Sequence, residues 1–197
     1  MVMLKDKGSE ALEELMNEAQ LIATTLMRKI GEMSATLFIH GSEGKTIFRP
    51  KSMNSEAAKD QFVEESRIMC IAHGADAVVY CSEAWMLTPK TDKPLDLSVA
   101  PSKSPDRQEV LIFIGESREG HIHKSLPIVR AEGGKFAGFG EATEIRPDSV
   151  RGRFAQFLPE MMPTEEDRKI AMLYLAAKGI VPAEKRDKYR EQGRAMF

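Results

Sequence analysis

Hydrophobic residues recur every three or four positions in three stretches of the chain. The stretch from residue 9 to residue 30 has the most regular apolar face, and it predicts an amphipathic helix. A second, less regular stripe runs from Asn54 or Ser55 to Gly74. The third covers residues 164–179, where Thr164 and Asp167 fit a capping box at the start of a helix. The pattern therefore predicts three helices.

Between these helices the hydrophobic residues alternate with polar ones or form short runs, which is typical of strands. Short glycine-containing segments separate most of the runs, so we expect hairpins and an antiparallel arrangement. The run 77–87 is apolar on both sides, which predicts a central strand. The predicted strands cover residues 36–40, 45–49, 77–87, 109–115, 121–131 and 136–145.

This order of elements predicts an α+β protein: a single domain with a largely antiparallel sheet of about five or six strands, packed with two to three helices. We expect the domain to cover residues 1–179, with a long proline-rich loop at 88–107 and a charged helical or frayed tail at 180–197. The element order is similar to that of roadblock/longin and profilin-like modules. Because this likeness is one of order alone, it implies nothing about function.

Composition and charge exclude several classes of partner. The 197 residues carry 28 Lys and Arg against 30 Asp and Glu, which leaves a formal net charge of −2. Such a chain has no overall attraction for nucleic acid or for an anionic membrane, so we expect neither as a partner. No apolar run approaches the ~20 residues that span a bilayer, and no secretory signal is recognisable. With two widely spaced cysteines, this predicts a cytoplasmic protein with reduced thiols.

Two histidines, His121 and His123, stand two positions apart on a predicted strand. Alternate residues of a strand point to the same face, so both imidazoles could converge on one divalent metal ion. The short turn before this strand places Glu116 opposite His121. Counting outward from the next turn, at Gly133–Gly134, places Glu144 opposite His123. The four residues are thus candidate ligands for zinc, manganese or iron.

The metal hypothesis depends on the register of the second hairpin. A bulge at Pro127 would shift the pairing by one residue and send Glu144 to the other face of the sheet. The alternative is then a solvated end of a sheet with cross-strand His–Glu pairs.

Two further sets of charged residues are candidates for chemistry. Arg146, Arg151 and Arg153 lie close together in sequence and could hold an anion such as phosphate or carboxylate; the alternative is an ordinary charged surface. Glu83 lies within the apolar run 77–87, where burial would raise its pKa and suit it to acid–base catalysis. The alternative is a structural ion pair with Arg107.

No recognised enzyme motif is present, so the sequence leaves open whether the protein is an enzyme. The leading hypothesis is a non-catalytic interaction or regulatory module that self-associates through a sheet edge or the helix 9–30; twelve methionines favour an adaptable interface. The first alternative is a metal-dependent hydrolase with a site based on His121 and His123 and with Glu83 as its base. The second is a sensor domain for a small ligand.

Overall fold

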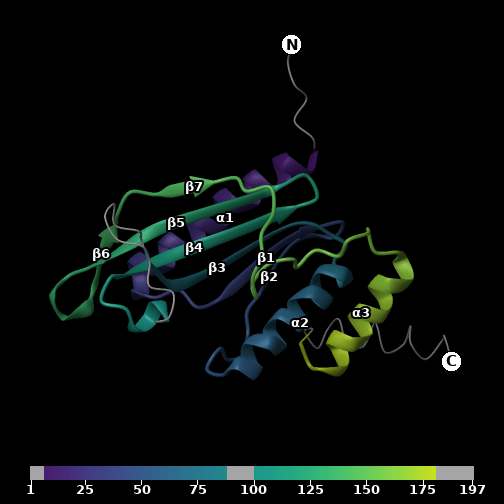
Figure 1. Cartoon of the computed structure of the whole chain (residues 1–197). Coiled ribbons are helices and arrows are strands. Elements are labelled where there is room, and N and C mark those ends of the chain that lie inside the picture. Colours follow the sequence, from purple (N-terminus) through teal and green to yellow (C-terminus); the bar gives the residue numbers. More distant parts are fainter. Residues whose placement is uncertain (1–6, 88–99, 181–197) are drawn as a thin grey trace, which may run out of the picture.

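The structure, a computed structural model, describes residues 7–87 and 100–180 (Figure 1). Seven strands form one antiparallel sheet in the order β2-β1-β3-β4-β5-β6, and β7 also pairs with β5. Three α-helices accompany the sheet, so the α+β prediction is confirmed. The helices and strands are α1 (Lys7–Ile30), β1 (Thr36–Gly41), β2 (Gly44–Phe48), α2 (Glu56–Ala72), β3 (Ala75–Leu87), β4 (Arg107–Ser117), β5 (His121–Arg130), β6 (Phe136–Phe139), β7 (Thr143–Ile145) and α3 (Glu165–Ala177), with two short 3-10 helices, η1 (Pro101–Lys103) and η2 (Glu132–Gly134).

The helices divide into two layers with the sheet between them. α1 lies along one face of the sheet, whereas α2 and α3 lie side by side on the other face (Figure 1). Each face has its own buried apolar cluster. The cluster under α1 includes Leu15 and Phe113, and the cluster under α2 and α3 includes Phe62 and Leu175.

α1 packs very close to the sheet because a glycine lies beneath it. A Cβ atom built on Gly115 of β4 would be 2.8 Å from Met16 Cε and 3.0 Å from Leu12 Cδ1. The regular apolar stripe of α1 therefore rests directly on the backbone of β4. This packing buries the apolar face of the helix, including Leu15 at 1% exposure and Met27 at 0%.

β3 is a central strand, as its apolar sequence predicts. It lies between β1 and β4, and its first half is buried on both faces. Val79 and Cys81 face the α1 layer, whereas Val78 and Tyr80 face α2 and α3. Period-two alternation therefore serves both cores from one strand.

The predicted strand 136–145 is instead two strands, β6 and β7. Near β6 the pairing matches the count from the glycine turn, with Ile128 opposite Phe139. The backbone N–H of Gly140 then donates to Pro127 O at 2.8 Å, and the chain leaves the ladder before β7. The pairing resumes one residue out of step, with His123 opposite Ile145. Proline has no N–H for a ladder hydrogen bond, which favours such an interruption at Pro127.

Parts of the predicted organisation lie outside the described residues: 88–99 of the loop and 181–197 of the tail. The remainder of the loop contains η1 and the beginning of β4. None of the helices in the described residues has the length and apolar character that crossing a lipid bilayer requires.

Candidate functional site

The four predicted metal ligands do not come together. Glu116 is opposite His121, as the sequence predicts. The register expected for Glu144 is wrong, because Glu144 pairs with Lys124 and so points to the opposite face from His123. The described residues contain no group of three or more His, Cys, Asp or Glu that could hold a metal ion.

The remaining members of this set have other surroundings. Glu116 is only 9% exposed, and its carboxylate accepts backbone hydrogen bonds from Phe157 at 2.9 Å and Leu158 at 3.2 Å. Burial lowers the pKa of His123, and the neighbouring His121 lowers it further. His121 Nδ1 and His123 Nε2 are buried and have no hydrogen-bond partner among the described residues. Glu116, by contrast, holds the segment before α3 through its two backbone hydrogen bonds.

The three arginines proposed to bind an anion lie apart in ion pairs or on the surface. Arg146 pairs with Glu13 and Glu144, at 3.1 and 3.2 Å. Arg153 instead reaches acidic residues of α2, with Nε 3.2 Å from Asp60. Arg151 is exposed on the surface. Since nearby carboxylates already neutralise Arg146 and Arg153, the structure does not bring these residues into one anion site.

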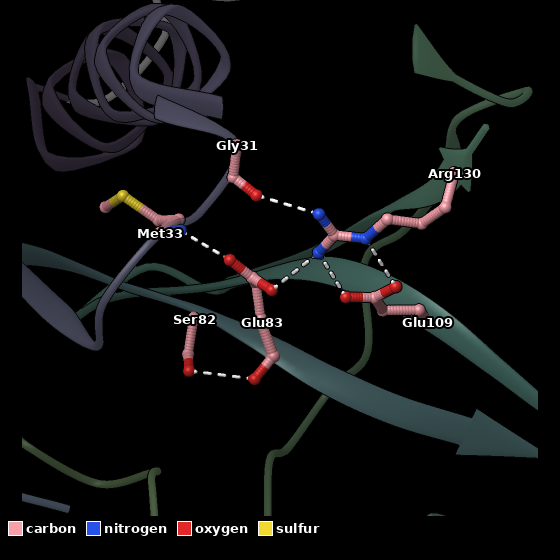
Figure 2. A network of polar contacts seen from close by, with 6 residues as sticks. All are labelled: Gly31, Met33, Ser82, Glu83, Glu109 and Arg130. Carbon is pink, nitrogen blue, oxygen red and sulfur yellow. Dashed lines mark hydrogen bonds and ion pairs between the residues drawn. The ribbon is translucent and has the colours of Figure 1, made fainter. Parts of the chain in front are cut away.

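Glu83 belongs to a polar network at the end of α1 (Figure 2). Its carboxylate accepts hydrogen bonds from the backbone N–H of Met33 and, at 3.2 Å, from Arg130 Nη2. Arg130 also donates to both carboxylate oxygens of Glu109 and, at 2.8 Å, to Gly31 O. One guanidinium thus joins β3, β4 and β5 to the segment that follows α1.

The expected ion pair of Glu83 therefore exists, but Arg107 as its partner is wrong. The Arg107 guanidinium instead lies 4.5 Å above the ring of Trp85. Burial raises the pKa of Glu83, partly offset by the hydrogen bond from Met33 and the charge of Arg130. Hydrogen bonding from Arg130 lowers the pKa of Glu109.

A catalytic role for Glu83 stays a prediction. Glu83 does not line any of four hollows on the described part of the surface, whose volumes run from about 320 to about 720 Å³.

The largest of these hollows lies on the other side of the sheet, between α2 and α3. We call it the apolar groove; its volume is about 720 Å³. Met161 is 81% exposed, Met162 55% and Ile170 60%, so large apolar side chains face solvent at one place. The groove is lined by Ile68 and Ile71 of α2, by residues 159–164, and by Asp167, Ile170, Ala171 and Tyr174 of α3.

Polar contacts hold the methionine-bearing wall of the groove in place. Arg118 Nη1 donates to Glu160 O at 3.0 Å and its Nη2 to Pro159 O at 3.1 Å. The Nε of the same guanidinium lies 3.1 Å from Met162 Sδ. Nearer the beginning of this segment, Arg67 Nε donates to Gln156 O at 3.1 Å. Together with the two backbone hydrogen bonds that Glu116 accepts, these contacts fix the segment against the rest of the domain.

Most polar groups beside the groove are engaged within the protein. Thr164 and Asp167 bond each other in the capping box of α3, as the sequence predicts. The Tyr174 hydroxyl lies 3.3 Å from Glu64 Oε1, and the Lys178 ammonium lies 5.5 Å from the centre of the Tyr174 ring. Both charged residues that line the groove, Glu160 and Asp167, are acidic.

The hydrophobic pattern did not predict this groove or the role of Arg130. Two adjacent methionines between Pro159 and Pro163 were the available signal for the groove, since apolar residues in a proline-flanked segment without periodicity are hard to bury. Arg130 gives no comparable signal, because its partners come from three distant segments.

Comparison with known protein families, with curated proteins and with solved structures finds no match for this chain.

Proposed function

We propose that this protein is an interaction module that binds an amphipathic helix of another protein in the apolar groove between α2 and α3. The observation that carries the proposal is the exposure of Met161, Met162 and Ile170 around one hollow. Helix-in-groove recognition places a row of apolar side chains, spaced by three or four residues, into a cleft of this kind. Methionine suits such a cleft because its unbranched side chain adapts to different partners.

The polar groups favour a protein partner over a small ligand. A small-molecule site usually encloses most of its ligand and directs several polar groups at it. Here Thr164 and Asp167 are occupied with each other, and the Tyr174 hydroxyl contacts Glu64. The apolar wall at Met161 is mostly exposed, so a broad apolar surface complements it better than a small enclosed molecule.

Charge favours a different protein over a second copy of this chain. Glu160 and Asp167 line the groove and Glu64 adjoins it, so two facing copies would bring like charges together. Of the nearby cations, Lys178 lies over Tyr174 and Arg118 is directed at backbone carbonyls. A helix with Lys or Arg beside its apolar row would complement this acidic border. The apolar face of α1 is buried, so self-association through that face is not proposed.

A synthetic helical peptide tests the proposal. It carries Leu at positions i, i+3 and i+7, Lys on the flanking positions and no Met, and its binding to the full chain is followed by fluorescence anisotropy. We expect saturable binding that Ile170→Glu weakens by about tenfold or more, because a carboxylate would be desolvated against the peptide. Leu21→Glu is the matched control: Leu21 is 66% exposed but lies on α1, across the sheet, and its substitution should leave binding unchanged.

Three results would contradict the proposal. The first is no saturable binding to the unsubstituted protein. The second is an equal loss of binding with Leu21→Glu. The third is a stable dimer, measured by light scattering, that Ile170→Glu converts to a monomer, since the groove would then hold a second copy of the chain.

A further inference from the structure

We propose that Met161 and Met162 are oxidation sites, and that their oxidation by peroxide weakens binding of a partner in the apolar groove. The effect on binding rests on the proposed function, whereas the selectivity of oxidation depends on the structure alone. Exposure separates these two methionines, at 81% and 55%, from the buried ones. The buried set is 7% exposed or less and consists of Met16, Met27, Met33, Met69 and Met172. Accessibility of the thioether decides which methionine a dissolved oxidant reaches first.

The chemical step is a transfer of one oxygen atom. A lone pair on the methionine sulfur attacks one oxygen of hydrogen peroxide, the O–O bond breaks, and the second oxygen leaves as water after proton transfer. The sulfur is oxidised by two electrons to a sulfoxide, and the peroxide is reduced by two electrons. A thiol-dependent methionine sulfoxide reductase reverses the change: two thiols become a disulfide and the oxygen leaves as water.

The two exposed methionines are not equivalent. Arg118 Nε donates a hydrogen bond to Met162 Sδ at 3.1 Å, and the same guanidinium is fixed by two backbone carbonyls. This donation engages a lone pair that would otherwise attack the peroxide, and Met162 is also the less exposed of the two. Met161 should therefore react first, Met162 second and the five buried methionines last.

Oxidation changes what the groove offers a partner. A sulfoxide places a strongly polar oxygen beside the apolar side chains of the groove, such as Ile68 and Ile170. Docking of an apolar helix face would remove water from that oxygen without supplying a hydrogen bond, which opposes binding. The fold itself should persist, because neither side chain belongs to the buried clusters.

Peptide mapping by mass spectrometry tests the order of oxidation. The full chain is treated with increasing hydrogen peroxide under native conditions, and the sulfoxide at each methionine is quantified. We expect Met161 to be oxidised before Met162, and both before the buried set. Oxidation of the buried methionines at the same rate, or of Met162 ahead of Met161, would overturn the assignment. Met53 and Met86 are partly buried and are not part of this comparison, and Met1, Met3 and Met196 lie outside the described residues.

The helical peptide described above tests the consequence. Oxidised protein should bind it about tenfold more weakly, and the reductase with a thiol reductant should restore binding. The double variant Met161→Leu, Met162→Leu keeps an apolar wall without a reactive sulfur, so its affinity measured after the same peroxide treatment should equal its own affinity before it. If oxidised and untreated protein bind equally well, the inference fails and the proposed function stands. If untreated protein does not bind, the proposed function fails and the effect on binding fails with it.

Discussion

The two faces of the sheet are covered in different ways. On one face a single 24-residue helix, α1, buries its apolar stripe against the strands, and the Arg130 network fixes the segment that follows it. On the other face two shorter helices and an irregular segment cover the sheet, and they leave large apolar side chains exposed between them. The long regular helix buries most of its apolar residues and leaves Leu21 and Ile30 exposed singly, whereas the joint between two helices and a segment creates a groove. We infer from the difference that the first face serves structural stability, and the proposed docking groove lies on the second.

Truncation of one apolar residue on each face should have very different effects on stability. Leu15, 1% exposed under α1, should cost about 2–5 kcal/mol of unfolding free energy when changed to Ala, because the change leaves a cavity. Ile170→Ala in the groove should cost less than about 0.5 kcal/mol, because Ile170 already faces solvent. Chemical denaturation of both variants measures the difference. Similar losses in the two variants would contradict the division between the faces.

This difference between the faces was only partly predictable from the sequence. The regular stripe of residues 9–30 predicts α1, because a helix that rests on a sheet must repeat its apolar residues at the helical period. The apolar run around Val79 and Tyr80 predicts the central strand for a similar reason. Both predictions depend on the local spacing of apolar residues, which decides directly which side chains an element can bury.

The sites depend on contacts that a local pattern cannot encode. The position of Glu144 was missed because one residue leaves the ladder beside Pro127, and every later side chain then changes face. Strand pairing puts Arg107 opposite Leu87, four residues along β3 from Glu83, and Arg130, from another strand, is the partner of Glu83. The groove depends on where Arg118 holds the segment 159–162, which has no hydrophobic period at all.

Removing Arg130, the centre of the polar network, should have the next largest effect on the free energy of unfolding. Arg130→Met leaves Glu83 and Glu109 close together without their shared cation, and it removes a donor from Gly31 O. The three charged side chains are each about one quarter exposed or less, so we expect a loss of about 1–3 kcal/mol, below that of a fully buried ion pair. Thermal and chemical denaturation at pH 7 measure it. The control is Arg107→Met at the exposed Trp85 contact; an equal loss there would show that the network adds no particular stability.

The smallest expected effect is a change in how stability depends on pH. Burial raises the pKa of Glu83 above its ordinary 4.5, so the folded protein holds a proton that the unfolded chain releases between 4.5 and the raised pKa. Stability from Glu83 is therefore complete below pH 4.5 and is lost as the pH rises through this window. Glu109, with a lowered pKa, has the opposite dependence.

Replacement of one carboxyl separates the two contributions. Glu83→Gln removes the pH dependence that comes from Glu83 and leaves Glu109 in place. The variant should therefore gain stability relative to the unsubstituted protein as the pH rises from 4.5 to 7. Denaturant titrations across this range measure the gain. A difference between the two proteins that does not change with pH would contradict the assigned pKa direction.

The most direct test of the docking groove is methyl NMR of the full chain during titration with the helical peptide. With isotope-labelled Ile and Met methyl groups, the proposal predicts saturable shifts at Ile68, Ile71, Ile170, Met161 and Met162. It predicts no shifts at Met16 and Met27, which lie beneath α1 on the other face. Shifts confined to the α1 side, or an absence of shifts at saturating peptide, would contradict the assignment of recognition to the α2–α3 face.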